Sequence, residues 1–154
     1  MNTATNSLIQ NHWLEGEIVG INCLARNNGA VTLLTIYTVA SETEKNHYVF
    51  PLADTTVTSL EGYNDDIWTE VQAHPVSLTV GDLQVFCGEG GMGNEGFVAA
   101  QDINGLVWSL FSTESNPFVK MELINRILSV HSDLCIYKIN MDNLTDIKVT
   151  ILPV

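Results

Sequence analysis

Runs of β-branched and apolar residues recur along most of this chain, and many of them alternate with polar residues as half-buried strands do. The clearest is residues 31–39, Val-Thr-Leu-Leu-Thr-Ile-Tyr-Thr-Val. Similar patterns predict further strands at residues 17–24, 47–52, 76–78, 83–87, 97–101, 106–112, 135–139 and 147–151. Pro51 would stop the segment 47–52 or place it at a sheet edge, because proline has no N–H to donate to a neighbouring strand.

The polar segments between these runs carry the residues that tight turns require. Residues 26–29 and 102–105 both end in Asn-Gly, a pair that readily adopts the positive φ angles of a hairpin turn. Residues 81–82 and 142–143 are also expected to turn the chain between neighbouring strands. Strands joined by such short turns are predicted to lie antiparallel in a sheet.

Helical periodicity is weaker. Asn64 could cap a short helix with Asp65 and Asp66 in its first turn, where carboxylates meet the positive end of the helix dipole. The His74–Pro75 step would end this helix, because the residue before proline avoids helical geometry. Its apolar stripe would consist of Ile67, Trp68 and Val71.

The segment 117–130 fits two descriptions. Asn116-Pro117 is a good helix start, and three apolar residues after it follow helical spacing. The same segment also alternates as two strands around a turn at Asn125-Arg126, and its meander-like neighbours favour this interpretation. We therefore predict a mainly β fold, a β-sandwich or curved antiparallel meander with one or two short helices, in a single domain spanning residues 1–154.

Composition supports a folded core. Although the formal net charge is −12, the chain is 45% hydrophobic and its mean hydropathy is +0.14, whereas acidic disordered chains are poorly hydrophobic. The N-terminal residues show neither the basic nor the apolar region of a secretion signal, and the longest apolar stretch, residues 30–40, is too short to cross a membrane. A cytoplasmic protein without membrane attachment is expected.

Charge is distributed very unevenly. No lysine or arginine occurs between Lys45 and Lys120, whereas ten carboxylates do. They are Asp54, Glu61, Asp65, Asp66, Glu70, Asp82, Glu89, Glu95, Asp102 and Glu114. A field of one sign attracts partners of the opposite sign and repels phosphates, so this pattern favours a basic protein partner over direct nucleic-acid binding.

The glycine-rich segment 87–96 nearly spells one calcium-binding repeat, but such repeats bind calcium only when several copies stack. It also lacks the Gly-Lys-Ser/Thr ending of a phosphate-binding loop, and Glu89 and Glu95 would repel phosphate. Two interpretations stay open: a simple hairpin tip, or an acidic loop that wraps a basic partner.

Motifs for catalysis, metals and cofactors are absent from the sequence. The four histidines are scattered, and no spacing typical of zinc ligands or of a serine nucleophile occurs. The cysteines at positions 23, 87 and 135 have apolar neighbours, and we expect them to be buried and free. We therefore expect no cofactor, no metal and no enzymatic activity.

The tryptophans leave more than one possibility. Trp108 lies in an apolar run and is expected in the core, whereas Trp13 and Trp68 could form a ligand platform. Trp68 stands among Asp65, Asp66 and Glu70, a mixture typical of an interface anchor surrounded by charge. The alternative is a Trp68 packed inward with its acidic neighbours in solvent.

Residues 107–119, Val-Trp-Ser-Leu-Phe-Ser-Thr-Glu-Ser-Asn-Pro-Phe-Val, and the strand-turn pattern that continues to Ile151 resemble immunity proteins of contact-dependent inhibition and related polymorphic toxin systems. These proteins protect a bacterium against nuclease toxins delivered by its neighbours. The resemblance covers about the last third of the chain and implies a basic cognate toxin domain, an RNase or DNase, as partner.

No residue role carries over from that resemblance. Charge clustering alone predicts the toxin-binding residues Asp65, Asp66, Trp68, Glu70, Glu89 and Glu95. The alternative function is a β-sandwich ligand-binding or assembly module that uses exposed Trp13 or Trp68.

Overall fold

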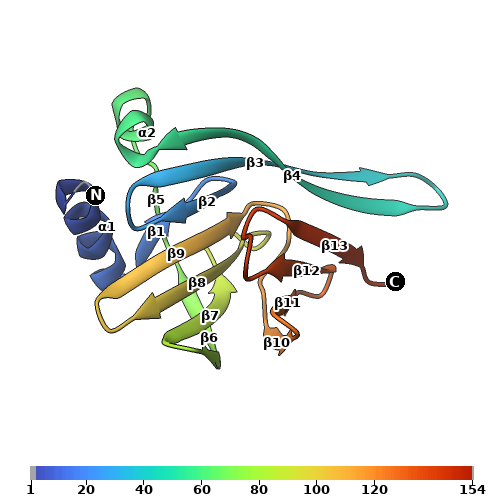
Figure 1. Ribbon diagram of the computed structural model, residues 1–154. Coiled ribbons are helices and arrows are strands. Elements are labelled where there is room, and N and C mark those ends of the chain that lie inside the picture. Colours follow the sequence, from blue (N-terminus) through green and yellow to red (C-terminus); the bar gives the residue numbers. More distant parts are fainter. Residues whose placement is uncertain (1–2, 154) are drawn as a thin grey trace.

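A computed structural model describes residues 3–153 and consists mainly of antiparallel β-sheet with two short helices, which confirms the predicted fold class (Figure 1). The elements in chain order are α1 (Thr3–Leu14), β1 (Glu17–Val19), β2 (Cys23–Arg26), β3 (Ala30–Ala40), β4 (Lys45–Thr56), α2 (Val57–Tyr63), β5 (Trp68–Glu70), β6 (Gln72–Val80), β7 (Leu83–Glu89), β8 (Gly96–Asp102), β9 (Gly105–Ser112), β10 (Lys120–Ile124), β11 (Ile127–His131), β12 (Cys135–Asn140) and β13 (Ile147–Ile151).

Seven strands form the large sheet, in the order β4-β3-β2-β9-β8-β7-β6. Its edge hairpin, β3–β4, extends beyond the rest of the sheet as a long arm (Figure 1). Pro51 lies in the edge strand β4, as its missing N–H predicts. The pairing register shifts here: Leu33 faces Ala53 and Leu34 faces Pro51, so Leu52 is an extra residue that forms a β-bulge.

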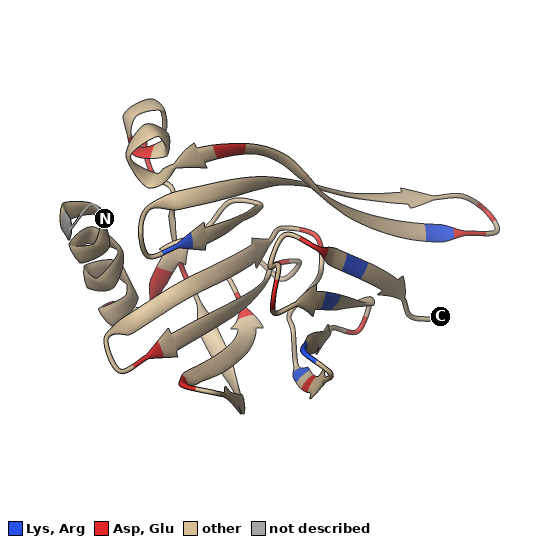
Figure 2. Ribbon diagram, viewed as in Figure 1, with Lys and Arg blue, Asp and Glu red and all other residues tan. Residues whose placement is uncertain are grey.

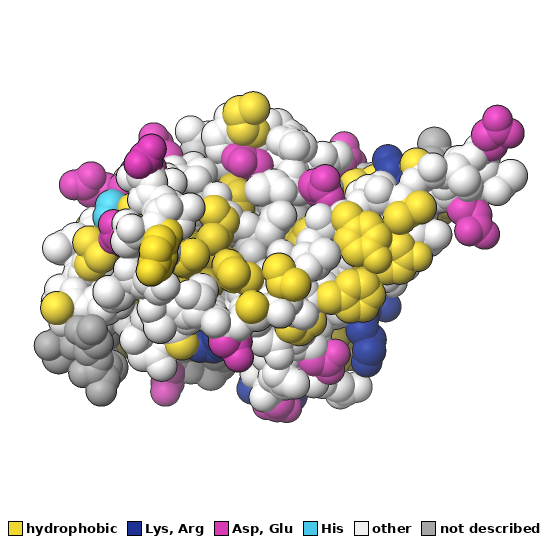
Figure 3. Space-filling model, turned by 90° about the horizontal axis from the view of Figure 1, so that it is seen from above, with side chains coloured by type: hydrophobic (Ala, Val, Ile, Leu, Met, Phe, Trp, Pro, Cys, Tyr) yellow, Lys and Arg dark blue, Asp and Glu magenta, His cyan; other side chains and the backbone are white. Residues whose placement is uncertain are grey.

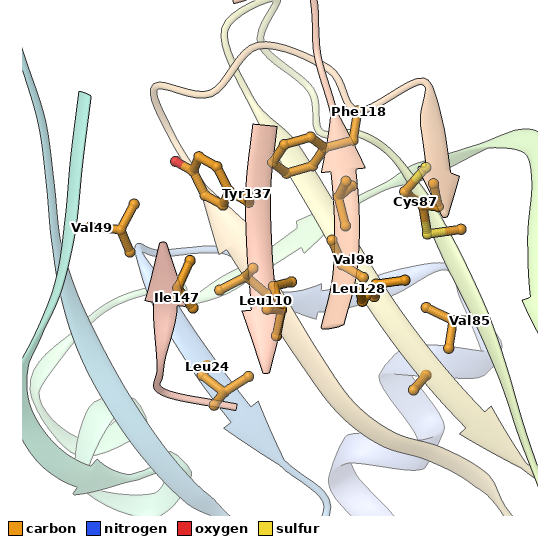
Figure 4. Close-up of a cluster of buried hydrophobic side chains, with 14 of the residues drawn as sticks. Leu24, Val49, Val85, Cys87, Val98, Leu110, Phe118, Leu128, Tyr137 and Ile147 are labelled. Carbon is orange, nitrogen blue, oxygen red and sulfur yellow. The ribbon is translucent and has the colours of Figure 1, made fainter. Parts of the chain in front are cut away.

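The last four strands form a small antiparallel meander that covers one face of the large sheet. The segment 117–130 is a pair of strands, as favoured from its alternation, and Asn125 and Arg126 form the turn with φ angles of 52° and 65°. Between the two sheets lies the larger apolar core. Figure 4 shows side chains such as Leu110, Leu128 and Tyr137 pointing into this layer.

The opposite face of the large sheet is covered by α1 and by the two-stranded sheet of β1 and β5. Ile9 from α1 and Ile18 from β1 pack there with Phe97 and Phe111 from the large sheet, and all four are buried. The sequence pattern did not predict α1. Its apolar positions give little helical periodicity, and the helix is held by tertiary contacts, such as Gln10 Nε2 donating to the carbonyl of Leu106 at 2.8 Å.

The helix predicted from Asn64 is wrong. Helix α2 lies just before that position, is capped by Thr56, whose side chain accepts from the Ser59 N–H at 3.1 Å, and ends at Tyr63. Burial of Ile67 and pairing of β5 with β1 then hold the following segment extended. Tertiary pairing therefore overrides the local capping signal.

Other expectations about the interior are confirmed. Trp108 is buried in the main core, and the three cysteines are free and fully buried. The predicted strand 17–24 is interrupted between β1 and β2, which belong to different sheets. Among the described residues, no helix is long and apolar enough to cross a membrane.

Candidate functional site

Two of the predicted acidic regions meet at a surface groove of about 390 Å³. Glu70 comes from the end of β5 and Glu89 from the end of β7, and the glycine-rich loop forms the rest of the wall. The groove is lined by Glu70, Gln72, Glu89, Gly90, Gly91, Met92 and Gly93. The structure thus brings together two carboxylates that are nineteen positions apart in the sequence.

A close approach of backbones builds this groove. Gln72 at the start of β6 pairs with Glu89, and Ala73 pairs with Gly88. A Cβ atom added at Gly88 would lie 2.0 Å from the carbonyl oxygen of Gln72, so only glycine lets β6 lie so near β7 here. The glycine-rich loop is the tip of the β7–β8 hairpin, as one interpretation of its sequence predicted.

Glu95, the other acidic residue of the loop, turns back onto its own hairpin. Its Oε1 atom accepts a hydrogen bond from the backbone N–H of Met92 at 3.0 Å, and its side chain is half-buried against Gly90. This contact orders the loop, and it uses an oxygen that a partner would otherwise contact. Glu95 therefore contributes to the shape of the groove more than to its open acidic wall.

Asp65 and Asp66 lie in the exposed link between α2 and β5, outside the groove. Asp66 Oδ1 accepts the backbone N–H of Trp68 at 2.9 Å and so guides the chain into β5. Asp65 and Asp66 were expected to act with Glu70 on one helix. Because no helix forms there, they are not held on a common face with Glu70.

Trp68 is not an exposed anchor. Its ring stacks on the imidazole of His12, with centroids 3.7 Å apart and planes 6° from parallel, and it packs against the second apolar cluster. His12 in turn contacts Glu17 at 2.7 Å. The inward-packed alternative considered for Trp68 is therefore the one that the structure shows.

The other tryptophan considered as a platform is also tied to the body of the protein. Trp13 is half-buried, and its Nε1 atom donates to the side chain of Gln101 at 3.0 Å. Sugar or ligand stacking needs an open indole face. His12 covers one face of Trp68, and Trp13 is half-buried against the second apolar cluster, so the geometry gives little support to a module that binds through exposed tryptophan.

The ten carboxylates of the basic-free stretch do not form one patch. Asp82 and Asp102 lie at one end of the β7–β8 pair, and Glu89 and Glu95 lie at the other. Each strand has seven residues, which places the two ends about 20 Å apart. Figure 2 shows the acidic positions spread over several turns and edges. The groove is where separate acidic segments converge.

Thiol chemistry has little support in the interior. Burial raises the pKa of Cys23 and Cys87 to about 12, and burial raises that of Cys135 to about 11. These thiols stay protonated at neutral pH, and the thiolate is the nucleophile and metal ligand. In residues 3–153, no group of three or more histidine, cysteine, aspartate or glutamate side chains is arranged to hold a metal ion.

A second surface feature was not predicted. Several large apolar residues are exposed on the β3–β4 arm, among them Tyr37 at 40%, Val39 at 50% and Phe50 at 50%. Residues 31–39 carry apolar side chains on both faces of the strand, but the cover on one face stops part of the way along the arm. The sequence carries no signal for where this cover ends, because apolar side chains continue on both faces through residues 31–39.

Comparisons of the chain with protein-family models, with curated proteins and with solved structures returned no match.

Proposed function

We propose that this protein is an immunity protein that binds and neutralises a basic cognate toxin domain, with a nuclease as the expected class of toxin. The observation that carries the proposal is the convergence of Glu70 and Glu89 on one groove within a long stretch that has no lysine or arginine. A nuclease is basic where it binds phosphates, so an inhibitor that covers this region gains association rate and specificity from negative charge.

The groove suits a protein partner better than a small anion. Its walls carry carboxylates, which repel phosphate, and the rest of its lining is Gln72 and the glycine-rich loop with the exposed side chain of Met92. A lysine or arginine from a partner can enter between Glu70 and Glu89, and charge-assisted hydrogen bonds to carboxylates are the stronger kind. Exposed loop carbonyls offer further acceptors.

The function itself is tested by co-expression with the product of the reading frame immediately upstream. We expect that product to stop growth when expressed alone, to be tolerated together with this chain, and to co-purify with it. An upstream product that is harmless alone, or that does not bind, would contradict the pairing.

The site is tested by the double substitution Glu70→Lys with Glu89→Lys. We expect the affinity for the upstream product to fall by at least about tenfold, mainly through slower association, because the groove changes sign where a basic partner must enter. Surface plasmon resonance at low salt measures both rates.

The matched control is Glu61→Lys with Asp82→Lys. Both side chains are exposed, neither lines the groove, and the change in net charge is the same. Equal losses in the two double variants would show that net charge alone governs binding and would remove the groove as the site.

A further inference from the structure

The outer half of the β3–β4 arm carries a row of aromatic side chains on one face. Strand alternation and pairing place Tyr37 opposite Tyr48, with Val39 and Phe50 on the same side. We call Tyr37, Val39, Tyr48 and Phe50 the aromatic face. Figure 3 shows hydrophobic side chains gathered on the arm. Leu52, which is 66% exposed, lies at the bulge of β4.

The aromatic face continues a buried surface. Val31 and Leu33 of β3 point to the same side and pack in the second apolar cluster, under the cover supplied by α1, α2, β1 and the segment around Ile67. Beyond Leu33, the side chains of Tyr37, Val39 and Phe50 on this side of the arm are exposed. The side chains stay apolar where the cover ends, which is the pattern expected of a surface that another molecule covers.

The aromatic side chains of this face hold one another in place within a single chain. The rings of Tyr37 and Tyr48 have centroids 5.0 Å apart with planes at 30°, and those of Tyr48 and Phe50 are 6.0 Å apart at 15°. Val49 and Ile36 lie on the other face of the arm and are buried in the main core. His47 is also buried there, with Nε2 2.6 Å from the hydroxyl oxygen of Tyr137. A surface held in place loses little entropy on binding.

The edge of the arm is poorly suited to pairing with a strand of another molecule, whereas its aromatic face is open to contact. β4 is an edge strand of twelve residues, which by itself would invite another strand to pair with it. Pro51 removes a donor from that edge, and the bulge at Leu52 breaks its regular spacing. An occupant of the arm therefore lies on the aromatic face.

Local charge distinguishes this surface from the acidic groove. Glu42 and Glu44 flank the tip of the arm together with Lys45, and Lys148 of β13 lines a groove of about 540 Å³ with Tyr48 and Phe50. Residues 120–154 carry four acidic and four basic residues, so the neighbouring meander is charge-balanced although the chain as a whole is at −12. Figure 2 shows lysines on the arm and on the meander. A basic partner gains little here, whereas a copy of the same mixed rim meets no single-sign repulsion.

The exposed area is sufficient for a weak, specific dimer. Tyr37, Val39, Phe50 and Leu52 are 40–66% exposed and Tyr48 is less so; with aromatic side chains of about 200 Å², together they expose on the order of 400 Å² per copy. Two copies would then bury about 800 Å² of apolar surface. Because about 60% of an interface is apolar, the total is about 1,300 Å², at the lower end of the range for specific interfaces.

We propose that the aromatic face is the contact surface of a homodimer, formed by two copies of this chain that pack their β3–β4 arms face to face. The contact is isologous: Tyr37, Tyr48 and Phe50 of one copy meet the same residues of the other. This surface lies apart from the acidic groove, and the proposal does not depend on the immunity function.

Sedimentation velocity of the full chain over a range of concentrations tests the dimer. We expect a monomer–dimer equilibrium in the micromolar range, and the substitutions Tyr37→Thr with Phe50→Thr should weaken it at least about 100-fold, since four aromatic anchors leave each dimer. The control, Tyr63→Thr with Ile103→Thr, removes two side chains that are 88% and 99% exposed elsewhere and should leave the equilibrium unchanged.

Two results of the sedimentation experiment would overturn the proposal. One is a wild-type chain that stays monomeric up to about 1 mM, which would leave the aromatic face to a different protein. The other is a dimer that the arm variant forms as well as the wild type does. Backbone amide chemical shifts followed on dilution give a readout without mutation: the changes should centre on residues 35–52, and changes centred on the acidic groove would contradict the proposal.

Discussion

The acidic groove and the aromatic face are built on opposite principles. The groove brings Glu70 and Glu89 together around a glycine-rich loop, and it offers charge and backbone with one exposed apolar side chain, Met92. The aromatic face offers stacked rings on an arm whose other face is buried in the main core, with charges of both signs at its rim. The first surface suits a partner of opposite charge, and the second suits one of similar character.

This difference shows why a charge count and a hydrophobic pattern report on different surfaces. A stretch without lysine or arginine is visible in the sequence even when the fold disperses its carboxylates, as it does for Asp82 and Asp102. An uncovered apolar face is invisible in the sequence, because residues 31–39 look alike whether or not another element packs on them. The uneven distribution of charge in the sequence therefore indicates the region of the groove, whereas the aromatic face is apparent only in the structure.

Substitutions on the two faces of the arm should have very different effects on the free energy of unfolding, and this is the largest difference that we expect. Ile36→Ala removes a buried side chain from the main core and should lower the free energy of unfolding by about 2–4 kcal/mol. Val39→Ala, three positions along on the exposed face, should change it by less than about 0.5 kcal/mol. Urea unfolding at a concentration where the chain is monomeric measures both. Similar losses would mean that the aromatic face is covered within the monomer.

His47, which is buried where the arm meets the main core, should make the stability of the protein depend on pH. Burial, with a smaller contribution from the charge of Lys45, lowers the pKa of His47 below its ordinary value of 6.5. The unfolded chain takes up this proton as pH falls below 6.5 while the folded chain resists, so the contribution of neutral His47 is full above pH 6.5 and declines below it.

We expect the free energy of unfolding of the wild type to fall between pH 7 and pH 5 with a contribution from this group of up to about 1.4 kcal/mol per pH unit. The variant His47→Gln should lose that contribution, whereas Glu89→Gln in the groove should keep it. Denaturant titrations at a series of pH values test this. An unchanged slope of stability against pH in His47→Gln would show that His47 is not held neutral on the core-facing side of the arm.

Raising the salt concentration should weaken binding at the groove but should not weaken self-association through the aromatic face. Between about 0.01 M and 1 M ionic strength, the Debye length falls from about 30 Å to 3 Å. Binding of a basic partner at the groove should weaken over this range, because the attraction is screened. Self-association should stay constant or strengthen modestly, because screening reduces the repulsion between two chains of charge −12. A dimer that dissociates as salt rises would indicate an electrostatic contact and contradict an apolar one.

Local signals were sufficient for most of the strands. The turn at Asn125-Arg126 is confirmed because two residues with positive φ fit that geometry, and Pro51 lies in an edge strand because it cannot donate within a sheet. Neither helix was predicted at its place: α1 was not predicted at all, and the helix predicted from Asn64 is wrong. α1 depends on distant contacts such as Gln10 with Leu106, and the capping signal at Asn64 is overridden by the pairing of β5 with β1.

The candidate site was predictable only in part. Glu70 and Glu89 were chosen from charge clustering, and their convergence depends on the pairing of β6 with β7 and on the close approach at Gly88. Trp68 was chosen because an aromatic residue among acids resembles an interface anchor, but His12, from a helix that the pattern did not show, stacks on it. Side-chain partners that come from unpredicted elements cannot be inferred from local spacing.

The central claim is that charge and apolar surface are separated into two regions with separate binding roles. Its most direct test is one series of affinities for the upstream reading-frame product, measured with the wild type, with Glu70→Lys/Glu89→Lys and with Tyr37→Thr/Phe50→Thr. We predict a loss of at least about tenfold for the groove variant and no change for the arm variant. A loss in the arm variant with the groove variant unaffected would contradict the claim.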